Sequence, residues 1–157
     1  MNICSYDTII GKIVLVATTE HITNLYLPKD TLPLNIIETE TPLLVEAVQQ
    51  INRYLAGDLK TFSLPINPSG TVFMKKVWEE LCNIPYGKTA TYKEIATKVG
   101  NEKAARAVGL ANNRNPIPII IPCHRVIGAN GALIGFRSGL ELKKSCLTLK
   151  GKNNVLF

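Results

Sequence analysis

Hydrophobic and polar positions alternate along the first 40 residues with the period of β-strands. Three segments show this alternation, residues 2–10, 12–19 and 22–27, and Gly11 separates the first two. Together they predict a small antiparallel meander.

From Thr41-Pro42 onward, the apolar residues recur with the period of an α-helix. Proline is favoured at the first position of a helix, so Pro42 marks the expected start. We expect Gly57 to end this helix and residues 62–66 to form another short strand. Asn67-Pro-Ser-Gly70 is the most linker-like segment, so we place a domain boundary between residues 1–70 and 71–157. The apolar stripe of the helix consists of Leu44, Val45, Val48, Ile51 and Leu55.

The second half of the chain predicts helices joined by turns. The first helix covers residues 72–81, and a turn follows at residues 85–89. Thr91 and Glu94 have the spacing of a capping box, in which each side chain satisfies the other residue's backbone N–H. The helix that they open is expected to end at Val99-Gly100.

A further helix over residues 102–111, capped by Asn101, would complete a helix-turn-helix. Lys103 and Arg106 provide its charge, and it has almost no side-chain bulk. Small residues permit either tight packing against another helix or close approach to DNA, and in this basic half of the chain we favour DNA. The small residues are Ala104, Ala105, Ala107, Gly109 and Ala111.

The composition is globular, with 46% hydrophobic and 19% charged residues among 157. The net charge of +6 is distributed unevenly, because residues 1–70 carry four basic and seven acidic side chains and residues 71–157 carry fourteen and five. A basic half offers one face to a polyanion such as nucleic acid, although it can also be only a solvated surface.

The cellular location is also suggested by the sequence. No apolar stretch is long enough to span a bilayer, and the N-terminus lacks a basic leader followed by an apolar core. The four cysteines form no CxxC pair, which favours free thiols over a disulfide scaffold. We therefore expect a cytoplasmic protein without membrane attachment.

An irregular, proline-rich apolar segment, residues 115–122, leads to Cys123-His124-Arg125. A cysteine is a nucleophile as the thiolate, and a neighbouring imidazole or cation lowers its pKa. Cys123 is therefore the candidate nucleophile. The other cysteines are interpreted as small buried hydrophobic residues: Cys4, Cys82 and Cys146.

Taken together, these residues resemble the O6-alkylguanine-DNA alkyltransferases. The match centres on Pro122-Cys-His-Arg-Val126 and extends over most of residues 71–151, whereas residues 1–70 match only in general layout. The other matching segments are Tyr86-Gly-Lys88, Thr91-Tyr92, Lys103–Gly109, Asn115-Pro116, Gly131-Ala-Leu133 and Gly135–Leu140.

The resemblance implies a reaction that each molecule performs once. Cys123 would attack the alkyl carbon on guanine O6 and keep the group as a thioether. His124 would act through a water as the base that forms the thiolate, and Tyr92 would donate a hydrogen bond to the departing guanine. The lesion must leave the duplex, because an alkyl carbon inside the base stack cannot be approached in line.

The resemblance also implies how double-stranded DNA containing alkylated guanine would be bound. The helix with Lys103, Ala104, Ala105 and Gly109 would enter the minor groove, where readout is largely limited to A·T versus G·C. Arg106 would fill the space that the flipped base leaves. Phosphate contacts would supply most of the affinity.

Four further residues receive roles by resemblance. Asn115 would hold the two halves of the C-terminal domain in register, and Arg137-Ser138 would lie in the loop that closes over the base. Arg125 would be either structural or phosphate-facing.

The implied fold is α+β. A small N-terminal α/β domain with an antiparallel, ribonuclease-H-like sheet would precede a mainly helical domain with a winged helix-turn-helix, whose wing-like turn is Asn130-Gly131. We expect a monomer that needs no cofactor, because the DNA is the alkyl donor, with O4-alkylthymine as a possible second substrate. Some relatives carry a zinc ion in the N-terminal domain, but only Cys4 and His21 are available here, so we expect no metal.

Two other functions fit parts of the pattern. A sensor or regulator would bind alkylated DNA without repairing it, but sensor relatives lack the reactive cysteine. A Cys-His hydrolase would need an oxyanion site and an activating partner for His124, and it would leave the Arg106 helix unexplained.

One position departs from the family pattern. The family usually places a glutamate in the last turn of the final helix, where it orients the histidine, and the ungapped equivalent here is Lys150. A lysine beside His124 would disfavour the imidazolium. Glu141, an upstream acid or a backbone carbonyl could take over the orienting role, or the thiol could be less reactive.

We therefore predict that alkyl transfer proceeds but is slowed in this chain. The substitution Lys150→Glu should raise the single-turnover rate on a duplex that contains O6-methylguanine. An unchanged rate would show that Lys150 does not limit the reaction.

Overall fold

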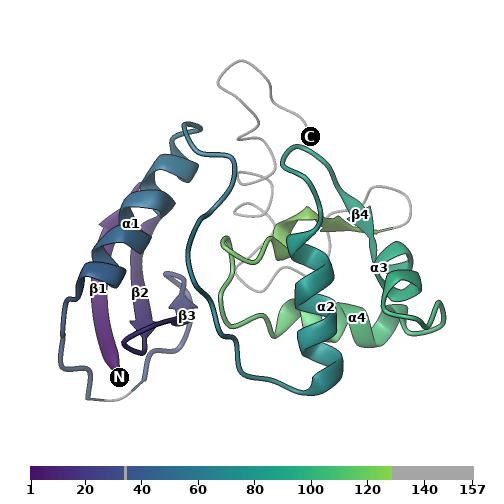
Figure 1. Cartoon of the computed structure of the whole chain (residues 1–157), viewed down its shortest axis with the longest axis horizontal. Coiled ribbons are helices and arrows are strands. Elements are labelled where there is room, and N and C mark those ends of the chain that lie inside the picture. Colours follow the sequence, from purple (N-terminus) through teal and green to yellow (C-terminus); the bar gives the residue numbers. More distant parts are fainter. Residues whose placement is uncertain (34, 129–157) are drawn as a thin grey trace.

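The computed structural model describes residues 1–33 and 35–128, which form an antiparallel sheet with one helix, an extended connector and a mainly helical second part (Figure 1). This α+β order confirms the expected fold class. The predicted wing at Asn130-Gly131 lies outside the described residues. None of the helices in the described part is long and apolar enough to cross a membrane.

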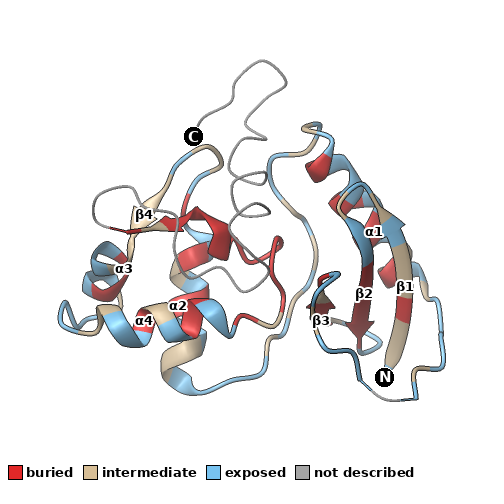
Figure 2. Ribbon diagram, turned by 180° about the vertical axis from the view of Figure 1, so that it is seen from behind, coloured by how far each residue is buried: buried red, intermediate tan, exposed pale blue. Residues whose placement is uncertain are grey.

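The predicted meander is present. Strands β1 (Asn2–Thr8), β2 (Gly11–Ala17) and β3 (Ile22–Tyr26) pair antiparallel in chain order. Gly11, at φ +112°, closes the turn between β1 and β2, a backbone conformation that glycine adopts without steric cost. The central strand β2 is buried from Ile13 to Ala17, as Figure 2 shows.

Helix α1 (Pro42–Leu55) also begins and ends as predicted. The Thr41 hydroxyl accepts the Leu44 N–H at 3.4 Å, and Gly57 follows the helix at φ +81°. The helix covers the sheet with one apolar face, and its last turn carries a buried tyrosine, Tyr54, whose hydroxyl contacts the second part of the chain.

The predicted strand at residues 62–66 is wrong. Only Ile66 pairs, in an isolated bridge to Ile22, with Ile22 N–H donating to the Pro65 carbonyl (2.8 Å) and Asn67 N–H donating to the Ile22 carbonyl (2.9 Å). Strand β3 begins at Ile22, and Pro65 has no N–H to donate, so a longer ladder does not form. Half-buried and exposed residues alternate in this segment because the connector packs against the rest of the protein along one side only.

The second part begins with helix α2 (Val72–Cys82), in agreement with the apolar spacing. Helix α3 (Tyr92–Lys98) carries the predicted capping box: the Thr91 hydroxyl accepts the Glu94 N–H at 3.0 Å, and the Glu94 carboxylate accepts the Thr91 N–H at 2.9 Å. Gly100, at φ +96°, follows the helix as expected.

Helix α4 (Ala105–Asn113) begins three residues later than predicted and extends two residues beyond Ala111. Asn101 does not cap it. Its side chain accepts the Lys103 N–H at 3.1 Å and its carbonyl accepts the Ala104 N–H at 3.0 Å, so residues 101–104 form a separate turn. Asparagine competes in this way with helix formation by bonding to nearby backbone.

The end of the connector fits tightly against α2. A β-carbon added at Gly70 would lie 2.5 Å from Cη2 of Trp78 and 2.8 Å from its Cζ3. The indole cannot move away freely, because it is buried and its Nε1 donates to the Ala111 carbonyl at 2.9 Å.

We therefore expect Gly70→Ala to lower the free energy of unfolding by about 1–3 kcal/mol through overpacking. Urea denaturation measures this loss, and the exposed neighbour Ser69→Ala serves as the matched control. Equal midpoints for the two variants would show that the indole accommodates the methyl group.

Candidate active site

The Cys-His-Arg motif forms a short 3₁₀ turn, η1 (Cys123–Arg125), at the end of the proline-rich segment. Cys123 is 3% exposed and His124 is 1% exposed. Ile119 in this segment has φ +74°, a strained value for a β-branched residue, so the surrounding packing must hold the loop in place. The predicted nucleophile therefore lies inside the protein on an irregular loop.

Two asparagines support this loop. Asn115 is buried, its amide donates to the Ile121 carbonyl at 2.9 Å, and its side-chain oxygen accepts the Ile117 N–H at 2.9 Å. These two bonds hold residues 115–121 together, and the register-holding role of Asn115 stays a prediction. Asn112, which the sequence did not single out, donates from its amide to the Cys123 carbonyl at 3.3 Å.

A two-stranded parallel sheet brings Tyr92 toward Cys123. Strand β4 (Ala90–Thr91) pairs with β5 (Val126–Ile127), so Tyr92 follows one strand directly and Cys123 precedes the other by three residues. Burial raises the pKa of the Tyr92 phenol above its usual value, and the nearby Cys123 raises it further. The raised pKa keeps the Tyr92 phenol protonated at neutral pH, so its hydroxyl can donate a hydrogen bond.

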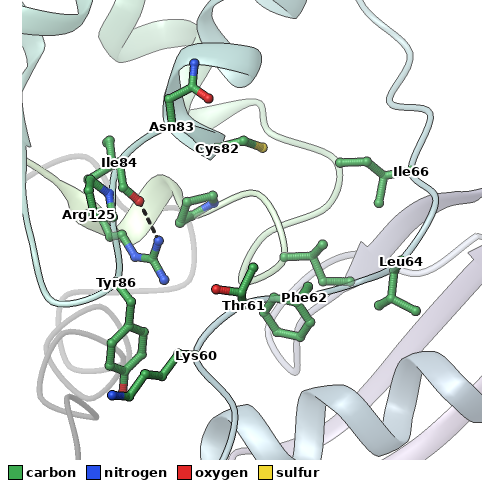
Figure 3. Close-up of a pocket in the computed structure, with 13 residues that line it drawn as sticks. Lys60, Thr61, Phe62, Leu64, Ile66, Cys82, Asn83, Ile84, Tyr86 and Arg125 are labelled. Carbon is green, nitrogen blue, oxygen red and sulfur yellow. Dashed lines mark hydrogen bonds between the residues drawn. The ribbon is translucent and has the colours of Figure 1, made fainter.

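His124 and Arg125 both contact the first part of the chain. The Tyr54 hydroxyl lies 2.9 Å from His124 Nε2, and Arg125 Nη2 donates to the same hydroxyl at 3.3 Å. Arg125 is 9% exposed, donates through Nη1 to the Ile84 carbonyl at 2.8 Å (Figure 3), and lies over the Tyr86 ring. This geometry favours the structural alternative for Arg125 over contact with phosphate.

A cavity of about 220 Å³ lies between the connector and the turn after α2 (Figure 3). Lys60 and Arg125 are the only charged side chains among its described lining residues, and Cys123 is not one of them. The cavity therefore borders the Cys-His-Arg turn at Pro122 and Arg125 but is not lined by the nucleophile.

Helix α4 has one side packed and one side exposed. Val108 and Ala111 are buried, and Gly109 is close enough to the Tyr92 ring that an added β-carbon would lie 3.9 Å from it. Ala104 and Ala105 are half-buried. Small residues thus serve the packing of α4 against the rest of the domain. The exposed residues of α4 include Arg106, Ala107, Leu110 and Asn113, and Lys103 is exposed in the turn that precedes the helix.

The burial of the other cysteines differs in part from the prediction. Cys4 is buried, as expected, but Cys82 is exposed at the end of α2, although desolvation around its thiol raises its pKa. A raised pKa disfavours the nucleophilic thiolate. Cys146, Arg137, Ser138, Glu141 and Lys150 lie outside the described residues.

The geometry combines a buried Cys-His pair, a tyrosine near the thiol and a helix, α4, that exposes Arg106. Two family models match the chain: the ribonuclease-like domain of 6-O-methylguanine DNA methyltransferase over residues 3–68, and the DNA binding domain of the same protein over residues 72–152. The chain belongs to the 6-O-methylguanine DNA methyltransferase family, and its second part is a DNA-binding domain.

Individual relatives agree with this assignment. The chain is 45% identical over 152 residues to the constitutive methylated-DNA–protein-cysteine methyltransferase of Bacillus subtilis, with 92% of each chain covered. It is 60% identical over 106 residues to the methylated-DNA–protein-cysteine methyltransferase of Methanosarcina acetivorans, with 68% of each covered. The crystal structure of Mycobacterium tuberculosis OGT in complex with DNA superposes with a TM-score of 0.88 at 42% identity, covering 96% of this chain and 93% of that one.

The bracing by Asn115 gives a stability prediction for the loop. Asn115→Ala removes two hydrogen bonds at a buried position and leaves the Ile117 N–H and the Ile121 carbonyl without the amide, so the free energy of unfolding should fall by about 1–3 kcal/mol. Chemical denaturation measures it, with the exposed Asn113→Ala as control. Equal stability of both variants would mean that water replaces the amide.

Proposed function

We propose that this protein repairs DNA by direct reversal, transferring a methyl or larger alkyl group from O6-alkylguanine to Cys123 once per molecule. The observation that carries the proposal is the placement of Cys123: it is buried next to His124 and near Tyr92, whose ring in turn contacts the helix with the exposed basic face. Family membership supports the same reaction class.

In the proposed step the Cys123 sulfur forms a bond to the alkyl carbon while the bond from that carbon to guanine O6 breaks. The thiol proton passes to His124 through a water, and the electron pair of the broken bond stays on the guanine, where a hydrogen bond from the Tyr92 phenol stabilises it. A thioether is not readily cleaved, so the protein is consumed stoichiometrically.

Access to the buried thiol requires the alkylated base to leave the duplex. We propose that α4 lies in the minor groove and that the exposed Arg106 occupies the vacated space, with Lys103 near a phosphate. Such phosphate contacts make affinity fall as the salt concentration rises.

We also propose that residues 1–70 and 71–157 are the two domains and that the protein acts as a monomer. One chain contains the cysteine, histidine and tyrosine of the site together with the basic helix. The three cysteines among the described residues are free thiols, which suits a reducing cytoplasm.

The reaction predicts a specific covalent product. After incubation with a duplex that contains one O6-methylguanine, intact-mass spectrometry should show the gain of a single methylene, and peptide mapping should place it on Cys123. Cys82→Ser should react like the parent chain, because its thiol is disfavoured as thiolate, whereas Cys123→Ser should not react.

Other outcomes would contradict the proposal. Lesion-selective binding without a mass gain would identify a sensor. Repeated turnover of an ester or peptide would identify a hydrolase.

A further inference from the structure

The end of α1 brings a tyrosine from the first part of the chain into the catalytic turn of the second. Tyr54 is 1% exposed, and its ring packs against Phe62 with centroids 5.0 Å apart and against the edge of Tyr86 at 6.0 Å. These contacts on two sides determine where the hydroxyl points. It lies between His124 Nε2 and the Arg125 guanidinium.

The direction of one of these hydrogen bonds is determined by chemistry. An arginine side chain only donates, so Arg125 Nη2 donates to the Tyr54 oxygen. Arg125 is itself held by the Ile84 carbonyl and by its position over the Tyr86 ring. The phenol oxygen has a second lone pair, which can accept from a histidine N–H.

The contact with Nε2 fits one of the two neutral tautomers of His124 in particular. When Nε2–H donates to the Tyr54 oxygen, 2.9 Å away, the basic lone pair of the ring is on Nδ1. Nδ1 can accept a proton only when the neutral ring carries its hydrogen on Nε2. In that tautomer Nε2–H donates to Tyr54.

We propose that Tyr54 is the positioning residue of the active site: its hydroxyl accepts the Nε2–H of His124, which holds the ring in the tautomer that leaves Nδ1 as the base for Cys123. This inference rests on the proposed function. A phenol orients the ring but carries no negative charge, so it does not offset the charge of the imidazolium as a carboxylate does. The proton transfer from the thiol is therefore less favoured than it is beside a carboxylate.

The first test is kinetic. Tyr54→Phe keeps the ring that packs against Phe62 and Tyr86 and removes only the hydroxyl. The single-turnover rate of methyl transfer should fall at least about tenfold, because the loss of the positioning hydroxyl removes part of the roughly 10²–10⁴-fold that general-base catalysis supplies. The affinity for unmodified duplex should stay unchanged. Tyr26→Phe, a half-buried tyrosine of β3, is the matched control and should react like the parent chain.

The second test is spectroscopic and does not depend on activity. The chain contains only two histidines, so ¹⁵N-histidine labelling gives one ring to follow, His124, and one internal reference, His21. In the parent chain His124 should show a protonated Nε2 and an unprotonated Nδ1. In Tyr54→Phe the two tautomers should mix, while the His21 signals stay constant.

The two tests separate the inference from the proposed function. Failure of the parent chain to accept a methyl group would refute the proposed function, while the nitrogen shifts would still report on Tyr54. A parent chain with the proton on Nδ1, or a Tyr54→Phe variant with an unchanged rate and unchanged shifts, would overturn the positioning role. Because the parent tautomer is measured without any substitution, a variant that folds poorly does not leave the inference undecided.

Discussion

Burial of the irregular segment at residues 115–127 is the constraint on which the site depends. Backbone N–H and carbonyl groups inside a protein need partners, and this segment is neither helix nor long strand. Its partners come from several directions: the Asn115 and Asn112 amides, the β4 strand that pairs with β5, and the N–H of Leu25 in β3, which donates to the Pro116 carbonyl at 2.8 Å. The same contacts that satisfy the loop place Cys123 near Tyr92.

The first part of the chain contributes to this arrangement more than its weak sequence match suggests. Its sheet edge binds the proline-rich segment through Leu25, and its helix α1 supplies the Tyr54 hydroxyl to His124 and Arg125. The charge of the chain is divided between the same two parts. The acidic first half provides contacts that position the active-site loop, and the basic second half contains the exposed face of α4. Arg125, for which the sequence left a structural and a phosphate-facing role open, is buried and links the two parts through the Tyr54 hydroxyl and the Ile84 carbonyl.

The features that the sequence predicted correctly are those that depend on residues close together in the chain. The capping box at Thr91 and Glu94, the proline after Thr41 and the alternation in the first three strands act over three or four residues, and each was found where it was predicted. The predicted strand at residues 62–66 failed because its half-buried alternation arises from packing and not from a ladder. The start of α4 was predicted three residues too early because Asn101 can either cap a helix or form a turn with the residues that follow it. In the structure its side chain and its carbonyl bond to Lys103 and Ala104, and a turn results.

The sequence alone was enough to determine the α+β order, the family and the reactive motif, because these depend on residue types at fixed short spacings. The partner of His124 was not accessible in this way. Tyr54 lies 70 positions earlier in the chain and carries no local mark that separates it from the other apolar residues of its helix. Contacts between distant segments are set by how a helix and a loop pack against each other. That packing results from the burial of many side chains at once, so it cannot be predicted from the spacing of residue types along the chain.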